Sequence, residues 1–248
     1  MSLFGDLDQT NAAPVEAESL GGSYVKTTGV YDFVVEMAYG GMSGGGAYFI
    51  DMKLKTENGE RMNVREYITS GSEKGTRPYY IDKDGKQRSL PGYSKMNAVD
   101  VILTGNAAQY PITEPKQIML WNKDAEKEVP TQVEVVTGWI GKPLTGLVKC
   151  TREFKQVDSG KKKANGQAIW IDSTDTRESA EVVHFVDAVT GQTRSEKVTG
   201  KDAAVKPQFE SKFNSDYVYD KTKGKGKPAA KADEPAADAV IPFGQAQA

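Results

Sequence analysis

Histidine and cysteine, the residues most often used for catalytic chemistry, are scarce in this chain. Its 248 residues include one histidine, His184, and one cysteine, Cys150. A Ser-His-Asp triad would have to use His184, which lies in the apolar run 182–186, and that run is typical of a buried strand. One Cys and one His do not make a zinc-binding cluster. We therefore expect both residues to be structural, and we expect a protein without catalytic residues, metal or other cofactors.

Two further patterns resemble ligand-binding motifs without meeting their requirements. The glycine-rich run 40–46 lacks the Lys-Ser/Thr pair of a P-loop and joins two expected strands, so we interpret it as a mobile connection. Residues 82–86 lack the ligand spacing of an EF-hand loop and indicate a hairpin turn. Magnesium nucleases use scattered carboxylates, of which Asp172 and Asp175 are examples, so a metal-dependent nuclease stays an alternative.

The clearest binding pattern depends on the register of one hairpin. Residues 47–55 and 61–69 both alternate between apolar and polar side chains, which is typical of strands. A two-residue turn between them would place apolar residues opposite polar ones. A three-residue loop, with Gly59 in the left-handed conformation, instead pairs Leu54 with Met62 and gives one continuous apolar face. That face is expected to consist of Tyr48, Ile50, Met52, Leu54, Met62, Val64 and Ile68.

The same register defines the opposite, solvent-facing side of the hairpin. It pairs Phe49 with Tyr67, Asp51 with Arg65, Lys53 with Asn63, and Lys55 with Arg61. Cations that neutralise phosphates and exposed aromatic rings that stack on bases are what single-stranded nucleic acid requires. Residues 74–80 and 83–95 continue the pattern, although the net charge of the whole chain is −2. The candidate contacts are Phe49, Lys53, Lys55, Arg61, Arg65, Tyr67, Arg77, Tyr79 and Tyr80.

A purely structural reading of these residues is the alternative. Lysine and arginine on a sheet protect its edges, and aromatic pairs across strands add stability. Trp121, Trp139 and Trp170 are expected in the core rather than on bases. Residues 161–163, three lysines, are expected in a solvated loop.

The remaining patterns indicate a mainly β protein. Residues 30–39 alternate, which places Tyr31, Phe33, Val35, Met37 and Tyr39 in the core. Further strands are expected at 116–121, 131–137, 144–157, 168–173 and 181–186. Short helices are expected only near 95–103 and 206–214. Many short strands with turn signals and few helices favour a closed barrel or a sandwich.

The two ends of the chain differ from this body. Residues 1–22 are polar and without periodicity, so we expect a flexible arm, followed by one domain over 23–220. Residues 221–248 are rich in Lys, Gly, Ala and Pro and are expected to form a disordered tail. No long apolar run predicts a membrane span, and residues 1–6 do not resemble a secretory signal. With a single cysteine the chain forms no internal disulfide, which favours the cytoplasm.

Several short motifs together resemble a protein family. They are Ser2-Leu3-Phe4-Gly5-Asp6-Leu7, Gly29-Val30-Tyr31, Ala38-Tyr39-Gly40-Gly41, Leu90-Pro91-Gly92-Tyr93 and Lys127-Glu128-Val129-Pro130-Thr131. In this order they are similar to bacteriophage-encoded single-stranded DNA-binding proteins. The resemblance implies an OB-like Greek-key β-barrel that coats single-stranded DNA without sequence preference during phage replication or recombination, in the host cytoplasm. The 47–69 hairpin would then be the strand 2–3 unit that binds oligonucleotides in such barrels.

The tail has a second resemblance. Val240-Ile241-Pro242-Phe243 is similar to the Asp-Ile-Pro-Phe end of bacterial single-stranded DNA-binding proteins, which recruits repair enzymes. Here five residues follow Phe243 and few acids precede the motif. It implies a tail that binds replication proteins. The rival to DNA binding is a β-sandwich that assembles into a virion, and the oligomeric state stays open.

Overall fold

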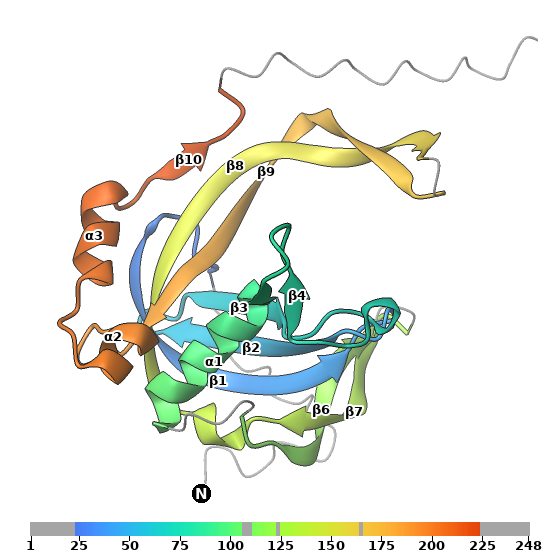
Figure 1. Ribbon diagram of the computed structural model, residues 1–248. Helices are drawn as coiled ribbons and strands as arrows, with labels where there is room; N and C mark the ends of the chain where they lie inside the picture. The colour runs from blue at the N-terminus through green and yellow to red at the C-terminus, as the bar shows by residue number, and fades with distance from the viewer. Residues whose placement is uncertain (1–22, 106–110, 123–124, 164–165, 224–248) are drawn as a thin grey trace, which may run out of the picture.

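The computed structural model describes residues 23–105, 111–122, 125–163 and 166–223. The expected arm 1–22, almost all of the expected tail and its 240–243 motif lie outside these residues. The fold is mainly β, as the sequence predicts, with one large sheet and few helices (Figure 1). The strands and helices, in chain order, are β1 (Gly29–Met42), β2 (Tyr48–Thr56), β3 (Arg61–Tyr67), η2 (Ser72–Lys74), β4 (Tyr79–Ile81), β5 (Gln87–Ser89), α1 (Pro91–Thr104), β6 (Glu114–Asn122), β7 (Lys127–Val135), η3 (Thr137–Trp139), β8 (Pro143–Lys162), β9 (Ala168–Val186), α2 (Arg194–Thr199), α3 (Val205–Lys212) and β10 (Val218–Asp220).

Strand β1 is the centre of the large sheet. It pairs antiparallel with β2 on one edge and with β8 on the other, and β3 and β9 extend the sheet outward in the order β3-β2-β1-β8-β9. The far end of β1 also pairs with β7, which carries β6, while β10 adds a short parallel pairing to β8. Among the described strands no ladder joins β3 to β9, so the sheet is open and the closed barrel stays a prediction.

The core lies between this sheet and helix α1. Buried side chains of α1 pack with those of β1, β2, β3 and β8 in one cluster that includes Met96, Val99 and Leu54. Trp139 is fully buried there, and its indole Nε1 donates to Asp100 Oδ1 at 2.8 Å. The burial of Trp139 confirms the prediction that it is a core residue. Asp100 provides the hydrogen-bond acceptor that a buried indole N–H needs.

A bulge in β1 changes the side-chain alternation that the sequence predicts. Phe33 and Val35 are buried as expected, but the pairing with β2 shifts between Val35 and Met37. A bulge inserts one residue and moves the following side chains to the opposite face. Ala38 therefore lies in the core, and Met37 is only half-buried, which corrects its predicted place.

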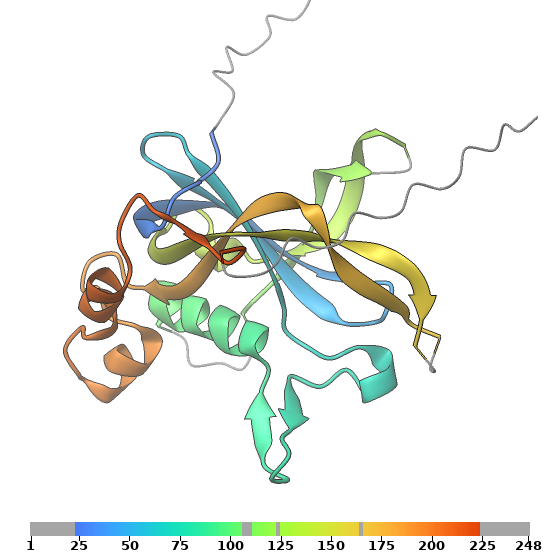
Figure 2. The ribbon, with the colours of Figure 1, turned by 90° about the horizontal axis from the view of Figure 1, so that it is seen from above.

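Two tryptophans and a tyrosine are also not where the sequence predicts. Trp121 on β6 and Trp170 on β9 are 66% and 59% exposed, and the side chain of Tyr48 is exposed as well. Trp121 and Trp170 belong to the β6–β7 and β8–β9 hairpins, which project from the body (Figure 2). His184 is exposed too, although its neighbours Val182 and Phe185 are buried.

The expected elements are found, with different lengths. Strands β8 and β9 form one long hairpin that contains the three strands expected at 144–157, 168–173 and 181–186. Strand β8 ends only at Lys162, so the first two of the three lysines expected in a loop belong to the strand. Helices α1 and α3 lie where short helices are expected. Helix α2 was not expected. It begins after Thr193, whose hydroxyl accepts from the Glu196 N–H while the Glu196 carboxylate accepts from the Thr193 N–H.

Candidate nucleic-acid interface

The β2–β3 hairpin has the register that the sequence predicts. Phe49 lies opposite Tyr67, Asp51 opposite Arg65, Lys53 opposite Asn63, Leu54 opposite Met62, and Lys55 opposite Arg61. Gly59 has φ +85° in the three-residue loop, a conformation that favours glycine. The apolar side of the hairpin packs in the core, and the side with the candidate contacts faces away from it.

Two aromatic rings meet on this outer face. The Phe49 and Tyr67 ring centroids are 5.9 Å apart in an edge-to-face arrangement, and the Arg65 guanidinium lies 4.2 Å from the Phe49 centroid. Gly41 of β1 lies beneath Phe49, where a Cβ atom would be 2.5 Å from the ring. The glycine therefore provides the space that lets the ring lie against the sheet. Tyr67 stays 47% exposed and presents ring surface to solvent.

Arg65 is held by an acid on the neighbouring strand. Its Nε and Nη2 donate to the two carboxylate oxygens of Asp51 at 2.7 and 2.5 Å, and Tyr39 Oη donates to the same carboxylate at 3.0 Å. This bond raises the pKa of Arg65. Burial and the nearby Asp51 charge raise the pKa of Tyr39 to about 12. The charge of Arg65 is thus matched by Asp51, and its guanidinium lies against the Phe49 ring.

The other cations of the hairpin differ in how far they are free to bind phosphate. Lys55 Nζ and Arg61 Nε lie 3.7 and 3.9 Å from the Glu36 carboxylate of β1. These are long, exposed contacts, which contribute little to stability and leave both cations accessible. Lys53 is exposed and has no carboxylate within ion-pair distance among the described residues.

The remaining candidate contacts line a groove of about 890 Å³ beside the end of β3. Tyr67, Arg77, Tyr79 and Tyr80 all border it, and Lys74 adds a further cation. The groove has two carboxylates among its lining residues. Glu66 is an ion-pair partner of Lys95, whereas Glu73 is exposed.

Local backbone contacts give this groove its shape. The loop before β4 is closed by Ser70, whose N–H donates to the Arg77 carbonyl at 2.8 Å and whose Oγ accepts from the Arg77 N–H at 2.9 Å. The Arg77 guanidinium lies 5.9 Å from the centroid of the Tyr79 ring. The β4–β5 hairpin turns at Asp82, as the sequence predicts, and the Asp82 carboxylate accepts from the Lys86 N–H. This small hairpin projects from the body, as Figure 2 shows.

Helix α1 approaches the groove through a glycine. Gly92 lies in its first turn, after Pro91, and a Cβ atom there would be 2.3 Å from the Tyr67 carbonyl oxygen. Only glycine permits that distance, because the atom it would meet belongs to the backbone. Gly92 therefore fixes the helix against the end of β3 and sets the position of Tyr67.

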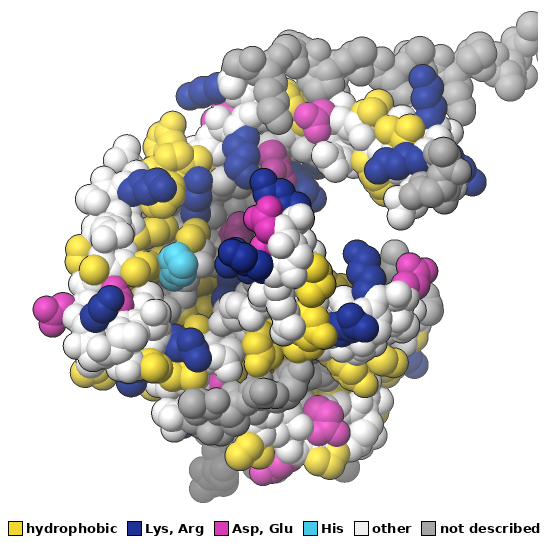
Figure 3. Space-filling view, in the orientation of Figure 1, with side chains coloured by type: hydrophobic (Ala, Val, Ile, Leu, Met, Phe, Trp, Pro, Cys, Tyr) yellow, Lys and Arg dark blue, Asp and Glu magenta, His cyan; other side chains and the backbone are white. Residues whose placement is uncertain are grey.

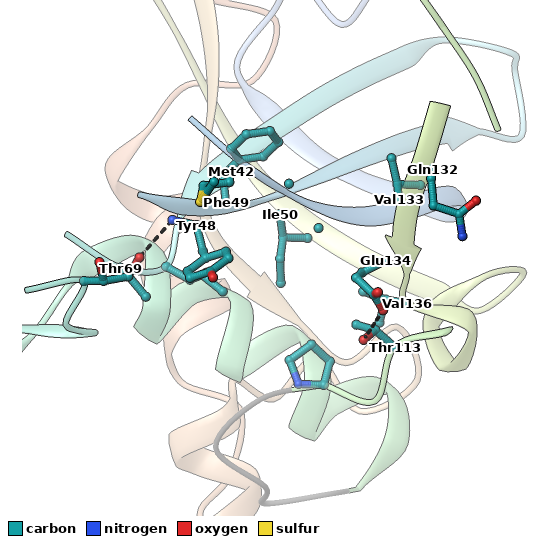
Figure 4. A pocket seen from close by; sticks show the side chains of 15 residues that line it. Met42, Tyr48, Phe49, Ile50, Thr69, Thr113, Gln132, Val133, Glu134 and Val136 are labelled. Atoms are coloured by element: carbon teal, nitrogen blue, oxygen red, sulfur yellow. Dashed lines mark hydrogen bonds between the residues drawn. The ribbon is translucent and has the colours of Figure 1, made fainter. Parts of the chain in front are cut away.

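A second cavity, of about 570 Å³, lies on the other side of Phe49 (Figure 4). Its walls come from the end of β1, the start of β2 and from β7, and include Met42, Tyr48, Ile50 and Val133. Glu134 on its rim accepts from Thr113 Oγ1 at 2.9 Å. Thr69 lines both this largely apolar cavity and the groove.

The structure thus divides the nine predicted contacts into two neighbouring groups that share Tyr67. One group follows the outer face of β2–β3, and the other lines the groove. Asp51 lies opposite Arg65 as predicted, whereas nothing in the sequence pattern indicated Glu36 beside Lys55 and Arg61. The roles of Gly41 and Gly92 were not predicted either, because close backbone approaches leave no local sequence signal.

Cys150 and His184, the two residues considered for a triad or a zinc site, lie on β8 and β9. Cys150 is buried in the core, and burial raises the pKa of its thiol to about 11. Although His184 is exposed, partial desolvation of its ring by the neighbouring residues and the charge of Lys95 lower its pKa. Within the described residues, no three His, Cys, Asp or Glu side chains gather where they could hold a metal ion. None of the helices in that part of the chain is long and apolar enough to cross a membrane.

Comparisons with known proteins add no further identification. No protein-family model matches the chain, and no curated protein is significantly similar to it.

Proposed function

We propose that this protein binds single-stranded DNA without sequence preference, and that it coats and protects transient single strands during phage replication or recombination in the host cytoplasm. The observation that carries the proposal is a set of neighbouring aromatic rings with cations beside them. Tyr67 and Tyr80 are exposed, and Phe49 and Tyr79 are half-buried. Lys53 and Arg77 are the exposed cations. Every base has a π-face, so stacking on such rings tolerates any sequence. The exposed cations supply the attraction to phosphate.

The strand order supports an OB-like barrel as the scaffold for this activity. In this proposal β1, β2, β3, β8 and β9 are the five barrel strands, and the β2–β3 face binds the oligonucleotide. The space between β3 and β9 is partly filled by residues 23–26. The Val25 N–H donates to the Arg61 carbonyl at 3.1 Å, and the Arg61 N–H donates to the Ser23 carbonyl at 2.8 Å. These bonds occupy the beginning of the β3 edge, at Arg61, on the side that faces β9.

The proposal extends to the chain beyond the described residues. The apolar motif 240–243 would bind replication proteins while the body holds DNA. Because few acidic residues precede the motif, we expect that contact to depend on the apolar side chains rather than on carboxylates.

A virion-assembly role is the second candidate, favoured by exposed apolar residues such as Trp121 and Trp170. It predicts self-association without affinity for oligonucleotides. A metal-dependent nuclease, the third alternative, predicts magnesium-dependent loss of a labelled oligonucleotide.

The test is a fluorescence titration of the full chain with a labelled single strand and with its duplex, at two salt concentrations. DNA binding predicts preference for the single strand and weaker binding at the higher salt concentration, since phosphate contacts release counterions. No binding at the lower salt concentration would refute the proposal and favour the assembly role. Magnesium added to the same samples tests the nuclease alternative.

A further inference from the structure

An arginine covers the Phe49 ring on the outer face of β2–β3. The central carbon of the Arg65 guanidinium lies over the ring, 4.2 Å from its centroid. The Tyr67 ring meets Phe49 edge to face, and a Cβ atom at Gly41 would lie 2.5 Å from Phe49. Phe49 is accordingly half-buried, so it offers a base less ring surface than an exposed aromatic residue does.

Asp51 and Tyr39 hold the guanidinium in place. Nε and Nη2 of Arg65 donate to the two carboxylate oxygens of Asp51 at 2.7 and 2.5 Å, a bidentate geometry that fixes the plane of the guanidinium. Tyr39 is 8% exposed, and its Oη donates to Asp51 Oδ2 at 3.0 Å, so a buried side chain in turn holds the carboxylate. Arg65 is therefore ordered before any ligand arrives, which lowers the entropy cost of binding one.

The guanidinium nevertheless stays accessible. The Arg65 side chain is 51% exposed, although Phe49 lies on one side of it and Asp51 occupies its Nε–Nη2 edge. The side turned away from Phe49 is therefore open to a ligand. A guanidinium is planar, delocalised and weakly hydrated, and it stacks on aromatic rings and on nucleic-acid bases. An unpaired base on that side would add a further layer to Phe49 and Arg65.

Its geometry, rather than its charge, distinguishes Arg65 from the other cations. In Figure 3 the Lys and Arg side chains are spread over the visible face, with Asp and Glu among them, so charge alone singles out no residue. On the hairpin, Lys53 is exposed, and Lys55 and Arg61 make only long contacts with Glu36. Among the described contacts of these four cations, Arg65 alone has a bidentate partner and an aromatic ring beside it.

We propose that Arg65 binds a base of the single strand by stacking, as the outer layer on Phe49, and that Asp51 and Tyr39 are positioning residues for its guanidinium. The inference rests on the proposed DNA binding and gives one of its contacts a different role, since Arg65 then stacks on a base instead of neutralising a phosphate. Asp51 supports DNA binding although it is a carboxylate. A purely electrostatic reading predicts the opposite for Asp51, because the loss of a carboxylate would strengthen the attraction of this face for phosphate.

Arg65→Lys tests the stacking, because lysine keeps the charge but lacks the planar group. The assay is a titration of the full chain with labelled single-stranded DNA at several salt concentrations. Arg65→Lys should bind about 5-fold more weakly or worse, as for loss of one stacked base. The dependence of its binding on salt should match that of the parent, since no charge is lost.

Arg177→Lys is the matched control. Arg177 on β9 likewise donates through Nε and Nη2 to a carboxylate on the neighbouring strand, at 3.1 and 2.8 Å from Glu153 Oε1. It lies outside the proposed contacts, and no aromatic ring is recorded beside it among the described residues. Its replacement should leave affinity unchanged.

Asp51→Asn tests the positioning role. The amide keeps the size of the side chain, but its N–H₂ group cannot accept a hydrogen bond from the guanidinium. We expect weaker binding, in the same direction as for Arg65→Lys. The double variant Asp51→Asn/Arg65→Lys should bind as Arg65→Lys does, because Asp51 acts through the guanidinium that lysine lacks. Thermal melts establish that each variant is folded at the temperature of the titration.

Three results would overturn the inference while the proposed function stands, provided that the parent binds single strands and Tyr67→Ala binds them weakly. They are parent affinity in Arg65→Lys, tighter binding by Asp51→Asn, and a lower melting temperature of Asp51→Asn with unchanged affinity, which would make the ion pair purely structural. A parent chain that binds no single-stranded DNA would overturn both the inference and the proposed function.

Discussion

Replacing Tyr67 with alanine tests the DNA-binding surface at the residue that its two parts share. Tyr67 lies on the outer face of β3, where its ring contacts Phe49, and it also borders the groove. Loss of one stacked base costs about 1–3 kcal/mol, which corresponds to about 5-fold to 140-fold weaker binding. The side chain is 47% exposed, so the substitution removes from folding the edge contact with Phe49, about 0.5–1.5 kcal/mol, together with the burial of the covered part of the ring.

The assay is a titration of labelled single-stranded DNA with the parent chain and three variants. Tyr67→Ala should bind weakly, and Tyr67→Phe should bind as the parent does because the ring remains. Tyr217→Ala is the control, since Tyr217 is an exposed tyrosine that contacts Tyr219 away from the hairpin. Equal affinity of folded Tyr67→Ala and the parent would refute the proposed role of the ring.

Three further predictions concern charge, ring placement and pH. Lys53→Ala should reduce the slope of the logarithm of the binding constant against the logarithm of the salt concentration by about 0.7, the value for one phosphate contact of a single strand. Lys55→Ala should reduce this slope by less. Equal slopes for the parent and Lys53→Ala would contradict the prediction. Gly41→Val should displace the Phe49 ring and weaken oligonucleotide binding, which a titration measures, while circular dichroism stays unchanged. Although burial opposes ionisation of Glu196, hydrogen bonds from backbone N–H groups lower its pKa to about 2 from the usual 4.5. Its stabilising effect should thus be present above pH 4.5 and be lost as pH falls toward 2; thermal melts of Glu196→Gln should match the parent only at the acidic end.

The β2–β3 hairpin was predictable because local alternation leaves only one register with a continuous apolar face. A shift of one residue reverses every side chain, so the parity of the loop decides the pairing. The solvent-facing pairs, from Phe49–Tyr67 to Lys55–Arg61, followed from the register that this loop length sets. The Asp82 turn was predictable for a similar reason, since its residues have a strong local preference.

The exposed tryptophans were not predictable from their own segments. Trp121 and Trp170 lie in runs that read as strands, and a large apolar residue in a strand is usually covered. Whether a second layer covers it depends on distant parts of the chain. Both β6–β7 and β8–β9 extend past the core, so their tryptophans remain at the surface.

Helix α2 and the bulge in β1 were both missing from the sequence-based prediction, for two different reasons. Thr193 and Glu196 are spaced as in a capping box, so the start of α2 was visible in the sequence. The shift between Val35 and Met37 has no such local signal, because it depends on how β2 pairs with β1. It decides that Ala38, rather than Met37, reaches the core.

Photocrosslinking of an oligonucleotide with bromodeoxyuridine along its length, followed by mass spectrometry, tests most directly where DNA lies on the protein. The account predicts crosslinks to peptides that contain Phe49, Tyr67 and Tyr79–Tyr80, and their loss with excess unlabelled single strand. Crosslinks confined to the β8–β9 hairpin, or none under conditions where the strand is bound, would contradict it.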